Sequence, residues 1–294
     1  KEYLNVLDFI GNYEKAGKAP LLLSGEQTFN KNESCEYQDL EYPDDCIVDF
    51  DMRLIDLFKE IDKKKLTLKM QIRQEYYRVK ELLDGKRPSR MDLFTYMDDE
   101  IYRICVSGSH AKENPFQQYL DFLYELGELS EDEQKLYAGI GREFIQTIET
   151  TEMQKVYKMP ILYSFYNHGN IRLAVTDEEV LESWKEFFDT GTNWKDFPNV
   201  NTYEDYKKVT DKQHLSKAKR MPIRFLKASG KGFFVEKDGY ALALRDEIGE
   251  VVGNMAFGEQ MGDVLGYRSL EYYRRRYEKA DEIGDRKKDI FDFL

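Results

Sequence analysis

The chain has 294 residues, 41% of them hydrophobic, and a net charge of −12 at pH 7. It contains no apolar run of about 18 residues, which excludes a membrane-spanning helix at the level of sequence. Its three cysteines are widely spaced and form no Cys-x-x-Cys pair, which argues against a zinc or disulfide framework and predicts a cytoplasmic protein.

The first fifty residues predict extended structure followed by a linker. Glu2–Ile10 is densely apolar, as in a strand buried on both faces. Gln27–Asp45 is polar and has no periodicity, which is typical of a long loop, and Cys46–Phe50 predicts a short strand. Because the chain enters its first strand directly at Lys1, we interpret it as a piece of a larger protein.

Residues 51–150 predict an all-helical module, because apolar side chains recur there at helical spacing. The predicted helices are Met52–Lys64, Leu66–Leu83, Arg90–Met97, Glu100–Cys105, Pro115–Leu126 and Glu131–Thr147. Gly85 ends the second of them, and Ser89 caps the third. Ser130 and Glu133 have the spacing of a capping box at the start of the last.

Residues 151–276 predict a mixture of hairpins and helices. Ile161–Tyr166 and Ile171–Val175 are interpreted as a hairpin across a turn rich in Asn and Gly. Thr176 and Glu179 then form a capping box, which begins an amphipathic helix carrying Trp184.

The remaining predictions follow in chain order. Tyr203–Val209 and Gln213–Arg220 are predicted helices, with a break or restart at Pro222. A second hairpin joins Gly232–Glu236 to Tyr240–Leu244 across Lys237-Asp238-Gly239. Val251–Arg276 is predicted to be mostly helical, with a break near Gly258–Gly262.

The predicted fold class is therefore α+β and predominantly helical: a helical module followed by a small domain of antiparallel hairpins and helices. The predicted divisions are residues 1–50, 51–150, 151–276 and a C-terminal tail, 277–294.

Positive charge is concentrated in two segments of this acidic chain. The first basic segment, residues 63–90, has ten basic and three acidic residues, and the second basic segment, residues 207–231, has nine basic residues and one acidic residue. The rest of the chain carries a net charge of −27. Such separation is more informative about partners than the total charge.

We predict that both segments contact nucleic-acid phosphates. In the first, Lys69 and Arg73 share a helical face, while Arg87 and Arg90 cluster at a helix start, where free N–H groups favour anions. The candidate contacts are Lys69, Arg73, Lys80, Lys86, Arg87, Arg90, Lys217, Arg220 and Arg224. The alternative for each segment is a solvated face, paired with carboxylates of the same chain. Tyr267, Tyr272 and Tyr273 either stack on unpaired bases or belong to the core.

Several catalytic classes lack their signatures. The sequence has no Gly-x-x-x-x-Gly-Lys-[Ser/Thr] loop, and Gly139-Ile140-Gly141 lacks the third glycine of a dinucleotide site. The three histidines are scattered, which argues against a zinc hydrolase. We therefore predict no catalytic residue, metal ligand or cofactor in this chain.

Both ends of the chain resemble bacterial DEAD/DEAH-box superfamily 2 helicases. Lys1–Tyr13 is similar to the strand and turn that follow their last helicase motif. Lys158–Phe188 and Arg220–Arg276 resemble the C-terminal region of the same proteins. Within them lie a Pro-Ile-x-Phe-Leu segment, a Phe-Phe…Gly-Tyr-Ala-Leu hairpin and a Tyr-Tyr-x-x-Arg end, here at Pro222–Leu226, Phe233–Leu242 and Tyr272–Arg275.

The resemblance implies that residues 1–23 complete a second RecA-like lobe and that residues 51–276 form an accessory region behind the motor. ATP and Mg²⁺ would then belong to the full-length parent enzyme, an ATP-dependent helicase, because the family's motor residues have no matching positions here. The expected partners are DNA, through its backbone, and the upstream lobes of the same protein. The rival prediction is a protein-interaction or regulatory module without a nucleic-acid role, and a third is an unrecognised nuclease.

Overall fold

The computed structural model describes residues 66–280, with side chains as far as Arg276. The predicted strands before residue 51, the linker, the helix Met52–Lys64 and the tail beyond residue 280 lie outside the described residues. The chain divides into two compact units after Gln74. Of the first unit, the structure describes residues 66–74, which include the beginning of α3 (Leu68–Leu82) with Lys69 and Arg73.

The helical prediction for residues 66–150 is confirmed. The helices after α3 are α4 (Arg90–Tyr96), α5 (Asp99–Val106), α6 (Tyr119–Leu126), α7 (Glu131–Ala138) and α8 (Ile140–Thr150). Ser89 and Ser130 cap α4 and α7, each with a complete capping box. The predicted helix Glu131–Thr147 is two helices, because Gly139 adopts an extended conformation between them.

The second half also consists mostly of helices. They are α9 (Lys158–Tyr166), α10 (Asp177–Asp189), α11 (Tyr203–Lys207), α12 (Asp211–Ala218), α13 (Arg224–Ser229) and α14 (Met255–Ala280). The capping box of Thr176 and Glu179 begins α10 as predicted. Val180, Trp184 and Phe188 form the buried face of that helix.

The first predicted hairpin is wrong, since Ile161–Tyr166 lies within α9. Ile161, Leu162 and Phe165 are all buried, so this helix has no polar face. A short apolar run that is buried on every side gives the same sequence signal in a strand and in a helix. Pro160 is tolerated because it lies in the first turn, where the backbone N–H has no partner within the helix.

The sheet has three short antiparallel strands in the order β1-β3-β2. They are β1 (Ala174–Val175), β2 (Phe234–Val235) and β3 (Leu242–Leu244). β2 and β3 form the predicted second hairpin, with Phe234 opposite Leu244, and Gly239 takes a positive φ of 82° in its turn. β1 pairs with β3, with Ala174 opposite Ala243.

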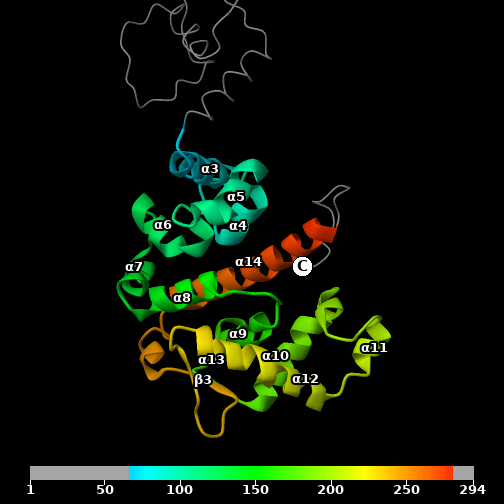
Figure 1. Ribbon diagram of the computed structural model, residues 1–294. Helices are drawn as coiled ribbons and strands as arrows, with labels where there is room; N and C mark the ends of the chain where they lie inside the picture. The colour runs from blue at the N-terminus through cyan, green and yellow to red at the C-terminus, as the bar shows by residue number, and fades with distance from the viewer. Residues whose placement is uncertain (1–65, 281–294) are drawn as a thin grey trace, which may run out of the picture. The chain divides into compact units, whose positions relative to one another are not determined.

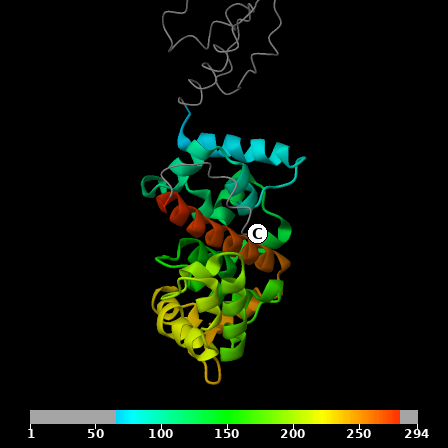
Figure 2. The same cartoon turned by 90° about the vertical axis from the view of Figure 1, so that its right-hand side faces the viewer.

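Helix α14 joins the two halves of the second unit. It packs against α4, α7 and α8 on one side and against α9 on the other (Figures 1 and 2). One hydrophobic cluster therefore contains residues from both sides of position 150, among them Phe144, Trp184 and Phe257. The predicted break near Gly258–Gly262 is wrong, because α14 continues through both glycines.

The chain also stays helical across Pro222. Lys219–Ile223 forms a π-helical turn that links α12 directly to α13. A proline cannot donate the backbone hydrogen bond of an α-helix, and a π-turn changes the bonding pattern locally. The predicted break is thus replaced by a wider turn.

Candidate functional site

Arg90 was predicted to contact phosphate, and the structure excludes it from that role. Its side chain is 0% exposed. Nη1 donates to Oε1 of Gln260 at 2.7 Å and to Oδ2 of Asp263 at 2.8 Å, while Nε donates to Oε1 of Glu149 at 3.1 Å. The guanidinium also lies 4.5 Å from the ring centre of Tyr119. Arg90 is a buried structural ion-pair centre.

Two further predicted contacts of the first basic segment are engaged by carboxylates. Arg87 Nη2 donates to Oε1 of Glu133 at 2.8 Å, and Nη1 donates to the carbonyl of Glu128 at 3.1 Å. Lys80 Nζ lies 2.7 Å from Oε1 of the same Glu128. Lys86 is exposed. Within the second unit, this segment therefore presents much less positive charge than its sequence indicates.

These pairs belong to one polar network inside the helical half. Gln260 Nε2 donates to Oε1 of Glu133 at 2.7 Å, so Glu133 is linked through Gln260 to Arg90. Although burial opposes ionisation, hydrogen bonds from Arg87 and Ser130 hold the pKa of Glu133 below its usual value. The network ties α4, α7, α8 and α14 together.

The second basic segment divides into paired and exposed cations. Lys219 pairs with Asp177 at 2.6 Å, and Lys227 pairs with Glu236. The three predicted contacts in the segment are Lys217, Arg220 and Arg224. Arg220 and Arg224 are exposed, and Arg224 lies 5.1 Å from the ring centre of Phe225. Lys217 Nζ lies 5.1 Å from the ring centre of Tyr157.

The fold brings Lys155 to Lys217 and brings Arg276 to Lys155. Partial burial and the charges of Arg220 and Lys155 lower the pKa of Lys217. Partial burial and Arg276 likewise lower the pKa of Lys155. Lys155, Lys217, Arg220 and Arg276 are called the cation cluster below. It comes from the loop before α9, the end of α12, the π-helical turn and the end of α14.

A single buried carboxylate anchors the cation cluster. Asp196 is 3% exposed; it pairs with Arg276, and its Oδ1 lies 3.9 Å from Lys155 Nζ. One carboxylate against four cations leaves three positive charges in the cluster. Sequence reasoning missed Lys155, because it lies outside both basic segments and no local pattern distinguishes it.

The tyrosines near the C-terminus belong to the core. Tyr267, Tyr272 and Tyr273 are each less than 10% exposed. Tyr267 stacks on Phe116, with ring centres 4.7 Å apart, and its hydroxyl lies 3.1 Å from that of Tyr102. The core alternative therefore holds, and these rings do not stack on bases in this conformation.

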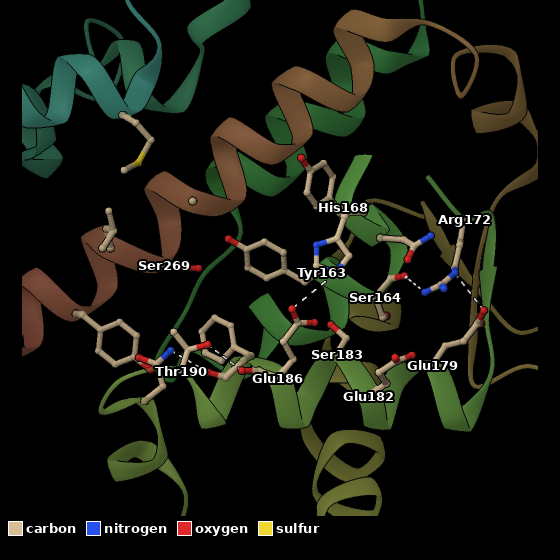
Figure 3. Close-up of a pocket in the computed structure, with 18 residues that line it drawn as sticks. Tyr163, Ser164, His168, Arg172, Glu179, Glu182, Ser183, Glu186, Thr190 and Ser269 are labelled. Atoms are coloured by element: carbon tan, nitrogen blue, oxygen red, sulfur yellow. Dashed lines mark hydrogen bonds and ion pairs between the residues drawn. The ribbon is translucent and has the colours of Figure 1, made fainter. Parts of the chain in front are cut away.

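A pocket of about 370 Å³ lies between α9, α10 and α14 (Figure 3). Aromatic side chains from all three helices line it: Tyr163, Tyr166, Phe187 and Tyr273. Hydroxyl groups of Ser183, Thr190 and Ser269 also reach its wall (Figure 3). Burial raises the pKa of Tyr163 to about 12, so this phenol stays protonated at neutral pH. We call this cavity the α10 pocket.

Charged residues surround the mouth of the α10 pocket. Glu179, Glu182 and Glu186 lie three and four residues apart, so they share one face of α10. Arg172 Nε lies 3.1 Å from Oε1 of Glu179, and His168 Nε2 lies 3.7 Å from Oε1 of Glu186 (Figure 3). With histidine neutral, the lining carries a net charge of −2.

An unusual turn carries His168 to this mouth. Asn167, His168 and Gly169 have successive positive φ angles of 43°, 52° and 94°. Such a conformation is uncommon for residues other than glycine, and its strain is often found at functional sites. Asn167 Nδ2 stabilises the turn by donating to the carbonyl of Asn170 at 3.1 Å.

The part of the chain that the structure describes contains neither a group of metal-ligating side chains nor a membrane-spanning helix. Residues 66–280 contain no group of three or more His, Cys, Asp or Glu side chains placed to hold a metal ion. No helix in this range is both long and apolar enough to cross a bilayer.

Comparison of the chain with models of protein families, with curated proteins and with solved structures finds no match.

Proposed function

We propose that this chain is the non-motor C-terminal region of an ATP-dependent DNA helicase and that it holds the nucleic-acid backbone. The helicase assignment rests on the resemblance of Lys1–Tyr13, Pro222–Leu226 and Tyr272–Arg275 to that family. ATP, Mg²⁺ and the RecA-like lobes are part of the proposal for the parent protein. The role in this chain is binding, with no catalytic residue assigned.

The cation cluster is the observation that carries the binding proposal. Lys155 and Arg276 flank the buried carboxylate of Asp196, and Lys155 and Arg220 lie close enough to Lys217 to lower its pKa, in a chain whose net charge is −12. Partial burial and then mutual repulsion oppose protonation of Lys155 and Lys217, and a phosphate oxygen placed beside them would favour the protonated forms. Arg224, which is also exposed, follows Arg220 in the helix that continues from the π-helical turn into α13. Backbone phosphates are the anions that such a surface recognises without reading sequence.

The first basic segment contributes less to the proposal. Lys80 and Arg87 already pair with carboxylates, so a phosphate would have to compete with Glu128 and Glu133. The pairing of these residues agrees with the alternative given for this segment, a solvated face paired with carboxylates of the same chain.

The test is binding of duplex and single-stranded DNA to the 294-residue protein at several salt concentrations. The variant Lys155→Glu/Arg220→Glu reverses two exposed cluster charges and keeps Arg276, which pairs with the buried Asp196. We expect duplex affinity to fall at least tenfold. The log–log salt slope should fall by about 0.9 for each lost phosphate contact.

The matched control is Lys112→Glu/Arg103→Glu. It makes the same change in net charge at exposed positions that belong neither to the cation cluster nor to the two basic segments. It should bind DNA nearly as the parent chain does. Equal losses in both double variants would attribute binding to net charge alone. Absence of binding by the parent chain at low salt would reject the proposal for this chain and favour the protein-interaction module.

A further inference from the structure

We propose that the α10 pocket binds a small organic cation: an amine or guanidinium group carried on an aliphatic stem. The pocket combines an aromatic wall with a row of carboxylates, and its chemistry is opposite to that of the cation cluster. The inference is independent of the proposed nucleic-acid role.

Charge determines which ligands the pocket accepts. Three glutamates and one arginine line it, and the arginine, Arg172, is already paired with Glu179. Glu182 and Glu186 therefore supply uncompensated negative charge, with His168 beside the latter. Phosphates, nucleotides and carboxylic acids would meet repulsion here, whereas a cation would be attracted.

Carboxylates at a solvated rim bind a cation weakly by themselves, because water screens the pair. The aromatic wall supplies the second contribution. The ring centre of Tyr163 lies 6.2 Å from that of Tyr166 and 6.1 Å from that of Phe187, so Tyr163 packs against both of the other aromatic rings. The face of such a ring attracts an ammonium or guanidinium group, and its apolar area covers an aliphatic stem.

Size and shape fit a ligand of this kind. A volume of about 370 Å³ lies at the small end of ligand pockets, which suits a single side chain or a short diamine. Helix α14 contributes Gly266 to the lining, and an added Cβ there would come no closer than 3.8 Å to Met91 Sδ. The glycine thus leaves space between α14 and α4 that a larger side chain would fill.

The same cationic chemistry occurs in free amines and in lysine or arginine side chains of peptides. Three probes distinguish these sources: 1,5-diaminopentane, agmatine and an acetylated, amidated Gly-Lys-Gly peptide. Isothermal titration with the full chain should give saturable binding of at least one probe, with one site per chain. Tighter binding of the diamine or agmatine would identify a free amine as the ligand, and tighter binding of the peptide would identify a side chain.

The decisive variant is Glu182→Gln/Glu186→Gln, which keeps side-chain size and removes both charges. We expect affinity for the bound probe to fall at least tenfold. Glu178→Gln/Glu204→Gln removes the same two charges at exposed positions outside the pocket lining and should bind as the parent does. Phe187→Leu tests the aromatic contribution and should weaken binding severalfold while the carboxylates remain.

Three results would overturn the inference. One is equal binding by both glutamine pairs, because attraction would then come from net charge alone. Another is saturable binding of inorganic phosphate in competition with the amines. The third is absence of binding by all three probes to the parent chain at low salt. Lys155→Glu/Arg220→Glu should leave amine binding within about twofold, which separates this site from the proposed DNA surface.

Discussion

Gly262 of α14 faces the phenol of Tyr166 on α9 with no room for a methyl group. A Cβ at position 262 would lie 2.5 Å from the hydroxyl oxygen and 2.8 Å from Cζ of that ring. The close approach explains why a long helix keeps a residue that disfavours helices. It also fixes one wall of the α10 pocket, since Tyr166 lines it.

Replacing Gly262 with alanine should destabilise the protein although alanine is the better helix former. The propensity gain is about 1 kcal/mol, and the overpacking cost is about 1–3 kcal/mol, because the whole Tyr166 ring must move. Gly266→Ala in the same helix meets only Met91 Sδ at 3.8 Å, so it should be neutral or stabilising by up to about 1 kcal/mol. Urea unfolding of both variants measures the difference, and a G262A chain as stable as G266A would contradict the packing argument.

Loss of Arg90 should be among the most damaging single changes in the helical half. Arg90→Met leaves Glu149 and Asp263 without their cation, and breaking a buried pair in this way costs about 3–5 kcal/mol. Arg90→Lys should not restore stability, because one ammonium group cannot reproduce the planar fork of donors. The free energy of unfolding in urea is the measurement.

The control for Arg90 is Arg103→Met, at an exposed position on α5, which should change stability by no more than about 0.5 kcal/mol. Introducing Glu149→Gln and Asp263→Asn into the Arg90→Met chain should recover part of the loss. If Arg90→Met proves as mild as the control, the buried ion pairs have little energetic weight.

His214 should make stability depend on pH. Burial, with a smaller effect from Lys185, lowers the pKa of His214 below its ordinary value. As pH falls below about 6.5, the unfolded chain takes up a proton that the folded chain does not, so stability should fall by at most about 1.4 kcal/mol per pH unit. His214→Phe, between Phe197 and Tyr206, should flatten the pH profile, and an unchanged profile would contradict the assignment to His214.

DNA binding at the cation cluster should be accompanied by proton uptake in alkaline buffer. The pKa values of Lys155 and Lys217 are lowered in the free chain, and a bound phosphate would raise both. Just below the ordinary lysine pKa of about 10.4, the complex should therefore hold more protons than its parts. Calorimetry in two buffers of different ionisation enthalpy counts them. Lys155→Arg/Lys217→Arg keeps the charge and should abolish the uptake while DNA still binds; unchanged uptake would contradict the assignment.

Local signals predicted local structure well. The cap at Ser89 and the capping boxes at Ser130 and Thr176 depend only on residues a few positions apart, and all three begin helices in the structure. The hairpin of β2 and β3 follows in the same way from its Asp-Gly turn. Lys158–Tyr166 could not be assigned by periodicity, because burial on every side removes the polar face that marks a helix.

The ion pairs of Arg90 and the cation cluster are formed by residues that lie far apart in the sequence, so residue spacing could not predict them. Arg90 resembles its exposed neighbours in sequence, but its partners Glu149 and Asp263 lie 59 and 173 positions away. Lys155 joins the cation cluster only because the fold brings the end of α14 to the loop before α9. Charge density in a sequence therefore identified a basic segment without distinguishing core cations from surface ones.

The π-helical turn at Lys219–Ile223 determines the directions in which the side chains of α13 point around the helix axis. A turn that holds one extra residue offsets later side chains by about 100° around the axis, relative to an uninterrupted α-helix. With that offset, Leu226 is buried and Arg224 is exposed. A one-residue deletion in the turn would carry the leucine toward water and the arginine toward the core, so length in this stretch is constrained as tightly as composition.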